Sequence, residues 1–275
     1  MSCVRISKGV RWLPCQGLWH DRGLPGERSG LRLPAAGRVI RDHPSEEDMP
    51  EQTARTLNHF AMYAFTEAYW SLESEAKNRF HQEWLGGLRA ATDKVDLYQV
   101  TDTKADVLAW CAAAADEPCS ASSYFEKLAK ATTPHRRLIR PVDSLWGFTR
   151  PSQYTKARST QEIDPFATSR KQYVVAYPFS KTAEWYLMSR ESRQGMMNEH
   201  IRIGKQYEEI QQLLLYSFGL QDQEFVVVYE TDDLAHFSDL VNELRDTEAR
   251  RYTLRDTPVY TAVYHPAEET LALWR

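Results

Sequence analysis

The chain has 275 residues, of which 42% are hydrophobic and 26% charged, a composition typical of a globular protein with one large domain or two small ones. Its formal net charge of −4 gives no reason to expect nucleic acid or an anionic membrane surface as a partner. No run approaches the roughly 18 to 20 consecutive apolar residues of a membrane-spanning helix.

The first 48 residues differ from the rest of the chain. They are rich in Gly, Pro and Arg, show neither helical nor strand periodicity, and lack the continuous apolar core of a secretory signal. We predict that residues 1–55 are a disordered leader, or upstream sequence before a natural start at Met49. The four cysteines form no CxxC pair, which favours a reducing compartment, with the cytoplasm as the default location.

Residues 56–150 predict the order strand, helix, strand, strand, helix, strand. Apolar and aromatic residues dominate the predicted strands, whereas Phe80, Trp84 and Leu88 recur every four positions in the first predicted helix. The six elements are predicted at 57–65, 72–91, 95–101, 106–112, about 120–131 and 143–150.

The same order repeats in residues 171–275, after a predicted linker at 151–170. Gly204 ends the first helix of this half, and Asp232 precedes the second as an N-cap type residue. The elements are predicted at 173–177, 189–203, 213–218, 224–230, 233–248 and about 252–264. Two βαββαβ units predict an α+β protein of two ferredoxin-like modules, whose antiparallel sheets can pair into one larger sheet or a barrel.

The densest cluster of candidate functional residues lies on the helix predicted at 189–203. One face of this helix carries Met196, Met197, His200, Ile203 and Gly204. A histidine on such a face can bind haem iron while sulfur and methyl groups pack on the porphyrin. Glu199 or another carboxylate can accept the second ring N–H. Taken alone, a single histidine on an apolar face is more often a packed core residue, and no second His or Cys stands at the spacing of a closed zinc site.

A set of motifs between residues 172 and 264 adds to this pattern. They are Tyr177-Pro178-Phe179-Ser180-Lys181, 185–188, 196–204, Tyr207, 217–220, 222–225, Leu244-Arg245, Glu248 and Tyr252. In this combination they resemble the chlorite dismutase-like family of haem proteins, whereas residues 56–150 match that family only in the order of their elements. The resemblance implies that His200 is the proximal iron ligand. It also implies a dimeric α+β barrel and a cyclic homo-oligomer, commonly a pentamer.

The strand after the His200 helix distinguishes the branches of this family. Chlorite-degrading members place a distal arginine there, but this stretch carries Gln212 and Leu213 and no arginine. A guanidinium can hold an anionic oxychlorine species by paired hydrogen bonds, so chlorite is expected to be a poor substrate. Gln212 resembles the distal glutamine of the coproheme decarboxylases, which can steer peroxide. Its spacing from His200 is one residue shorter, so either Gln212 or Leu213 can face the distal pocket.

The stretch from Tyr177 to Lys181 resembles the Tyr-Pro-Met-x-Lys motif of the decarboxylases, with Phe179 in place of Met. There the tyrosine lies beside a propionate and carries a radical, and Lys181 is the cation type that holds a carboxylate. Without the resemblance, Tyr177 is interpreted as a packed aromatic residue. The other expected contacts are Arg245, Tyr154 and Arg170 with propionates, and Met197 and Leu213 with the porphyrin.

The resemblance therefore implies a coproheme decarboxylase. Its substrate would be Fe-coproporphyrin III (coproheme), its oxidant hydrogen peroxide and its product haem b. One alternative is a general haem peroxidase, in which Tyr177 is structural. The other is a non-catalytic haem carrier or sensor, which would not need Tyr177, Lys181 and Arg245 together; their co-occurrence favours the enzyme.

Overall fold

The computed structural model describes residues 55–154 and 159–275. Almost all of the expected leader at 1–55, and residues 155–158 of the expected linker, lie outside the described residues. The described residues belong to one compact unit, 53–275.

The first module has the predicted order of elements, with a short helix α1 (Glu67–Trp70) after its first strand. Its other elements are β1 (Thr56–Phe65), α2 (Ser74–Ala91), β2 (Lys94–Val100), β3 (Val107–Ala114), α3 (Ser120–Thr132), the 3₁₀ turn η2 (Thr133–His135) and β4 (Ile139–Phe148).

The second module repeats this order and adds short elements. They are β5 (Tyr173–Lys181), α4 (Ala183–Leu187), α5 (Arg190–Gly204), β6 (Gln211–Tyr216), β7 (Phe225–Thr231), α6 (Leu234–Arg245), the 3₁₀ turn η3 (Glu248–Tyr252), β8 (Thr253–Arg255), β9 (Tyr260–Tyr264) and α7 (Ala267–Ala272). The single strand predicted at about 252–264 is two strands, because Pro258 lacks the N–H that a continuous ladder requires. β4 starts at Ile139 rather than at 143, and its ladder with β1 shifts register between Met62 and Tyr63.

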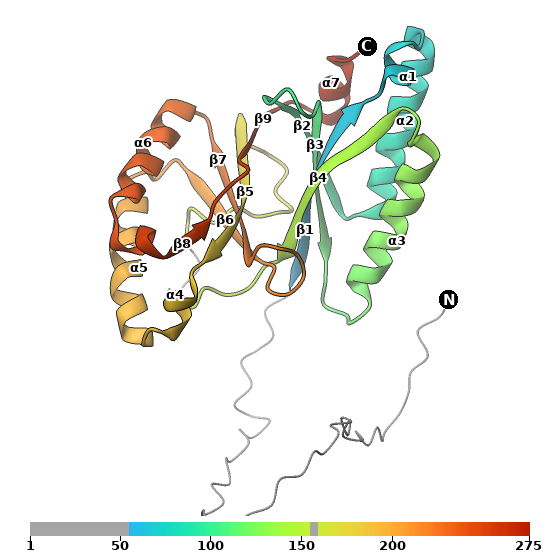
Figure 1. The fold of residues 1–275 in the computed structure, drawn as a ribbon. Helices are drawn as coiled ribbons and strands as arrows, with labels where there is room; N and C mark the ends of the chain where they lie inside the picture. The colour runs from blue at the N-terminus through green and yellow to red at the C-terminus, as the bar shows by residue number, and fades with distance from the viewer. Residues whose placement is uncertain (1–54, 155–158) are drawn as a thin grey trace, which may run out of the picture. The chain divides into compact units, whose positions relative to one another are not determined.

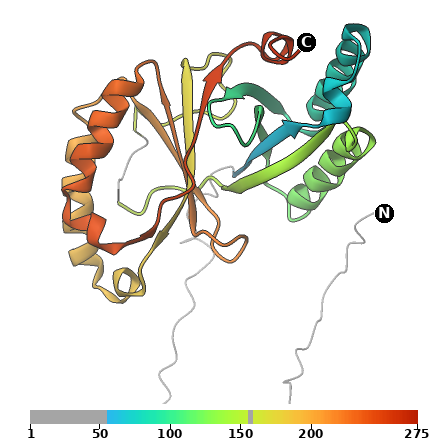
Figure 2. The same ribbon diagram turned by 45° about the horizontal axis from the view of Figure 1, so that its top comes forward.

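The nine strands of the described residues form one antiparallel sheet in the order β7-β6-β4-β1-β3-β2-β9-β5-β8. β7 also pairs with β5. The modules join where β4 meets β6, at Phe148 and Tyr216, and where β2 meets β9. Strands of both modules lie at the centre of the unit, α2 and α3 cover those of the first module, and α5 and α6 cover those of the second (Figures 1 and 2). The α+β class is confirmed.

The core between the strands of the two modules explains why so many strand residues are apolar. β1 is buried along nearly its whole length: Leu57, Ala61 and Tyr63 pack with α2 and α3, and Phe60 and Met62 pack against the second module. A strand buried on both faces loses the alternation of apolar and polar residues. Phe60 stacks on Trp110 with ring centroids 4.9 Å apart.

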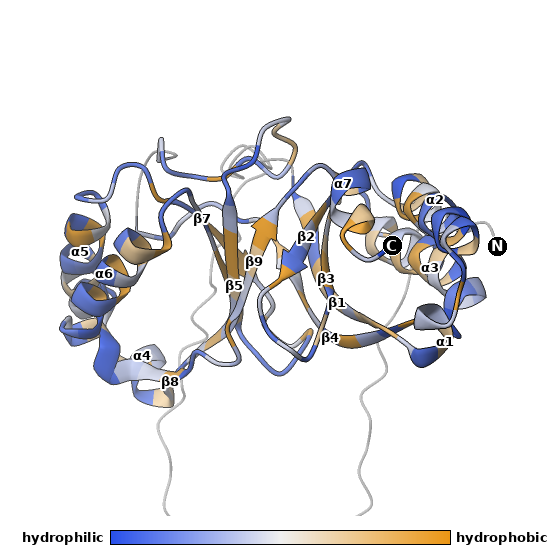
Figure 3. Cartoon of the chain, turned by 90° about the horizontal axis from the view of Figure 1, so that it is seen from above, coloured by the Kyte–Doolittle hydropathy of each residue, from blue (hydrophilic) through white to orange (hydrophobic). Residues whose placement is uncertain are grey.

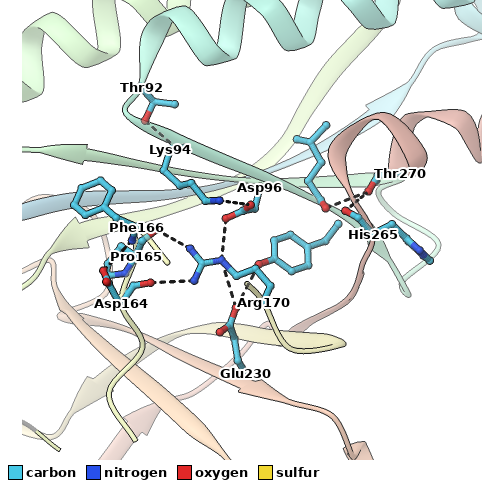
Figure 4. A network of polar contacts seen from close by, with 12 residues as sticks. Thr92, Lys94, Asp96, Asp164, Pro165, Phe166, Arg170, Glu230, His265 and Thr270 are labelled. Atoms are coloured by element: carbon cyan, nitrogen blue, oxygen red, sulfur yellow. Dashed lines mark hydrogen bonds and ion pairs between the residues drawn. The ribbon is translucent and has the colours of Figure 1, made fainter. Parts of the chain in front are cut away.

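A buried ion-pair network ties the linker to both modules (Figure 4). The Arg170 side chain is 1% exposed; its Nε lies 2.8 Å from an Asp96 oxygen on β2 and 3.7 Å from a Glu230 oxygen on β7. Its other two nitrogens donate to the carbonyls of Asp164 and Pro165. The guanidinium carbon lies 4.2 Å from the Trp110 ring centroid. Each of the three guanidinium nitrogens therefore donates a hydrogen bond.

Of the part of the chain that the structure describes, no helix is both long and apolar enough to cross a membrane.

Replacing Arg170 with Met removes the guanidinium but keeps a long side chain in the same space. We expect the free energy of unfolding to fall by about 3–5 kcal/mol, because two buried carboxylates lose their shared cation. Lys171→Met is the matched control: its partner Asp232 is 63% exposed, so the expected loss is below about 1 kcal/mol. Denaturant unfolding measures both changes. Equal losses would contradict the importance of the network.

The network also predicts a dependence of stability on pH. The pKa of Glu230 is raised from 4.5 to about 7, because burial, together with the nearby charge of Asp96, outweighs the opposing charge of Arg170. As the pH rises from about 4.5 to 7, unfolded chains release this proton before folded ones do. The free energy of unfolding therefore falls across this window, by up to about 3 kcal/mol. Glu230→Gln should flatten this part of the curve; an unchanged slope would show that Glu230 titrates alike in both states.

Candidate functional site

His200 is a half-buried residue near the end of α5. This helix begins after Ser189, whose hydroxyl accepts the backbone N–H of Ser192. Burial, together with the charge of Lys181, lowers the pKa of His200 to about 4. The ring is therefore neutral near pH 7 and has a nitrogen lone pair available for a metal ion.

The face of α5 that is turned to the sheet buries fewer side chains than the corresponding face of α2 in the first module. α2 buries seven side chains, whereas α5 buries only Ile203 and α6 only Leu240. Met196, Met197 and Ile201 remain half-buried. The core between these helices and the sheet contains six buried residues, against eighteen in the first module. Hydrophobic residues recur along α5 and α6 between hydrophilic ones (Figure 3), and the half-buried ones leave apolar surface that a ligand can cover.

Tyr177 lies on β5, on the sheet face that α5 and α6 cover, and packs with that small core. Its ring is nearly parallel to that of Tyr229 on β7, with centroids 6.4 Å apart. Burial raises the pKa of Tyr177 well above its usual range, and Tyr229 raises it further. The charge of Arg245 opposes this shift and that of Asp256 adds to it.

Lys181 ends the same strand, and its positive charge acts on the pKa of His200. Its Nζ donates to the Ala249 carbonyl at 3.0 Å and lies 4.4 Å from the Trp185 ring centroid. Burial, together with the charge of Arg250, lowers the pKa of Lys181 to about 8. An added carboxylate beside this ammonium would offset both effects.

Two arginines and one carboxylate complete this group. Arg245, at the end of α6, forms an ion pair with Asp256, and Arg250 donates to the same carboxylate oxygen at 2.6 Å. The Arg245 and Arg250 side chains are 43% and 38% exposed. Both guanidinium groups therefore keep donors free for another carboxylate.

The register of β6 decides between Gln212 and Leu213. Leu213 is buried in the core between the modules, with Val226 and Val228. Gln212 is exposed, is the direct cross-strand partner of Tyr229 and so shares its face of the sheet. Gln212 therefore faces the α5 side, and the expectation that Leu213 contacts the porphyrin is corrected.

Arg170 also does not belong to this group. Its donors are taken by the buried network between the modules, on the side of β7 opposite to Tyr229. The expected contact of Arg170 with a propionate is therefore corrected. Glu199 accepts the backbone N–H of Glu248 at 3.3 Å, so its carboxylate is directed to η3 instead of to the His200 ring.

Met197 is part of α5, and Tyr154, in the linker, lies next to this helix. The Tyr154 carbonyl accepts from the Gln194 side chain at 3.2 Å, and Met197 is half-buried. Both are therefore compatible with contacts to a ligand under this helix.

Sequence reasoning missed Tyr229, Arg250 and Asp256. Tyr229 stands in an apolar strand, where only the register with β5 shows that it meets Tyr177. Asp256 lies in the break between β8 and β9, and its pairing with Arg245 depends on the chain turning back.

The donor set fits a metalloporphyrin with carboxylates. Within the described ranges, no three His, Cys, Asp or Glu residues gather into a metal site, so these ranges do not offer a metal cage of their own. One neutral imidazole on an apolar face can serve as the axial ligand of an iron already held by a porphyrin. Lys181, Arg245 and Arg250 can hold carboxylates at its edge.

Comparisons with known proteins show which family and which solved structures the chain is similar to. The family model described as chlorite dismutase matches residues 72–265. A coproheme decarboxylase of Mycolicibacterium smegmatis is 30% identical over 178 residues, covering 64% of this chain and 75% of that protein. One of Staphylococcus saprophyticus is 30% identical over 167 residues, covering 56% and 67%. A structure of chlorite dismutase from Candidatus Nitrospira defluvii with imidazole has a TM-score of 0.69 at 22% identity, covering 80% of this chain and 94% of that chain.

Proposed function

The chain belongs to the chlorite dismutase family, and on that premise we propose that it is a coproheme decarboxylase. It would use hydrogen peroxide to convert two propionates of Fe-coproporphyrin III to vinyl groups, giving haem b. Two relatives that are 30% identical to the chain over the aligned 178 and 167 residues carry the name coproheme decarboxylase. The observation that carries the proposal is that Tyr177 packs in one core with Ile203, on the helix that bears His200, and with Leu244, the neighbour of Arg245 on α6. Lys181 ends the strand that carries Tyr177 and lies on the same face of it.

The reaction needs an oxidant and a hydrogen-atom acceptor. Each propionate loses its carboxylate as carbon dioxide and one hydrogen from its β-carbon, giving up two electrons. One peroxide takes these two electrons and two protons and becomes two waters. The bound substrate supplies the redox-active iron at which peroxide is reduced. The chain's own residues bind the substrate, orient one propionate and supply the phenol.

Each residue then has a separate part. His200 would hold the iron through its neutral ring, and Lys181 with Arg245 would hold the propionate carboxylates. Tyr177 would lose its hydroxyl hydrogen and then take a hydrogen atom from the propionate β-carbon. Gln212 would orient peroxide by hydrogen bonds; it has no charge with which to hold chlorite, so chlorite should be a poor substrate.

Two assembly features belong to the same proposal. β5 pairs with both β7 and β9, which supports the dimeric α+β barrel. The family resemblance supports a cyclic homo-oligomer, commonly a pentamer.

Replacing His200 with Ala removes the proposed iron ligand. We expect affinity for coproheme to fall at least about tenfold, as for loss of a group that holds a metal, and the ligated-iron absorption spectrum to disappear. Added imidazole should restore the spectrum. His236→Ala on α6 is the control, since this partly exposed histidine pairs with Glu209. An unchanged spectrum in His200→Ala would place the iron elsewhere.

Tyr177→Phe keeps the ring and removes only the hydroxyl. We expect coproheme affinity within about twofold of wild type, because the packing of the ring is retained. Vinyl formation should fall to the background rate. Separation of the porphyrins followed by mass spectrometry should show unconverted coproheme. Tyr173→Phe, on the same strand and face, is the control. Haem b formed by Tyr177→Phe at the wild-type rate would contradict the role of Tyr177, and none formed by wild type would overturn the decarboxylase.

A further inference from the structure

We propose that Arg193 is a further binding residue of the candidate site: its guanidinium holds one carboxylate of the porphyrin, two turns of α5 before His200. The inference rests on the proposed function and deepens it, because the proposed substrate carries two more carboxylates than the product and so needs additional cations. It concerns binding, and it is therefore testable without turnover.

Arg193 and His200 lie on the same face of α5. Seven residues separate them, which is close to two full turns, so both side chains leave the helix in nearly the same direction. Met196 and Met197 lie between them on this face, and Ile203, beyond His200, packs into the small core between the helices and the sheet. The half-buried Arg193 is therefore turned toward the candidate site and not toward the outer surface of the helix.

The spacing along the helix suits the size of a porphyrin. Seven residues at about 1.5 Å each span about 10 Å. An iron on His200 and the guanidinium of Arg193 would stand side by side at a comparable separation, because the two side chains run in the same direction. A pyrrole ring and its propionate chain extend outward from the iron, so Arg193 would meet the end of a propionate and not the iron itself.

The guanidinium of Arg193 lacks a protein partner among the described residues. Its Nε is buried and has no hydrogen-bond acceptor. A buried donor without an acceptor costs about 1–3 kcal/mol. Arg245 and Arg250, in contrast, share the carboxylate of Asp256. The unpaired Nε thus marks a place on this face where an acceptor from a ligand would complete the hydrogen bonding.

The carboxylate of Glu224, at the start of β7, is held by other donors. Its Oε2 accepts the hydroxyl of Tyr186 on α4 and the backbone N–H of Lys181. The charge of Arg193 lowers the pKa of Tyr186, although burial and Glu224 raise it by more. Arg193 therefore acts on this group through its charge, while its own donors stay available for a carboxylate.

The other cations of the site belong to a different part of α5. Glu199, in the turn of His200, accepts the backbone N–H of Glu248, which places the start of η3, the element that carries Arg250, beside this turn. Arg193 lies in the first turns of the helix instead. Cations at two places along one face would hold carboxylates on two sides of the porphyrin. This arrangement would limit the rotation of the ring about the iron and so select the propionate that meets the phenol.

Arg193→Met tests this inference, because it keeps a long side chain and removes the guanidinium. We expect the affinity for coproheme to fall at least about tenfold, the effect of losing one hydrogen bond between charged groups. The affinity for the tetramethyl ester of coproheme, which has the same ring and no ionised carboxylate, should stay within about twofold of wild type. Titrations followed by absorbance measure both. Arg193→Lys keeps the charge and should recover part of the affinity.

Arg202→Met is the matched control. Arg202 lies on the same helix and loses the same charge, but it is exposed and about half a turn away from the face of His200. Its affinity for coproheme should equal that of wild type. Denaturant unfolding of the free proteins provides a second readout. Arg193→Met should be at least as stable as wild type, because the guanidinium has no protein partner to lose, whereas a structural role would make this variant less stable.

The outcomes separate this inference from the proposed function. Wild-type affinity of Arg193→Met for coproheme overturns the role of Arg193, and so does an equal loss for coproheme and its ester, which would point to packing. Either result leaves the decarboxylase standing. A wild-type protein that binds coproheme through Arg193 but makes no haem b overturns the decarboxylase and supports the binding role. A wild-type protein that does not bind coproheme overturns both.

Discussion

A single buried guanidinium sets the relation between the two halves of this molecule. Arg170 is held by a carboxylate from β2 of the first module and one from β7 of the second, and it also binds two carbonyls of its own linker. Because side chains alternate along a strand, holding Glu230 on one side of β7 points Tyr229 to the other side. The network thus fixes which face of β7 meets α5 and α6. The side of β7 on which Tyr229 lies in the candidate site therefore depends on this network.

The two modules share one order of elements but differ in what lies between helices and sheet. In the first, aromatic residues such as Trp84, Phe80 and Tyr69 fill the layer under α2 and α3. In the second, the layer has few buried residues, and its helices carry half-buried apolar side chains and a histidine. Repetition of a fold therefore does not require repetition of function. Many buried side chains fill the layer of the first module, whereas few fill that of the second.

Much of the fold could be predicted from the sequence, and less of the site. The helix at α2 was predictable because Phe80, Trp84 and Leu88 repeat with helical spacing, and this is local information. Leu213 and Gln212 were not separable, because a shift of one residue exchanges the faces of a strand and the sequence carries no mark of register. Arg170 was predicted to bind a propionate, since a lone arginine in a linker gives no sign that Asp96, some seventy positions away, will hold it. Long-range pairing decides such residues, and only the folded chain shows it.

The backbone hydrogen bonds between the strands also affect how copies of this chain can associate. Within the described residues, each strand longer than three residues has a hydrogen-bonded neighbour on both sides, and only the three-residue β8 has one. A free edge is the usual template for strand addition by another chain and for aggregation. This arrangement limits such growth to the parts of β4 and β2 that lie beyond their short joints with the second module. Elsewhere in the described residues, association between copies has to use the side chains of helices and loops, and surface substitutions can alter it while they leave the sheet untouched.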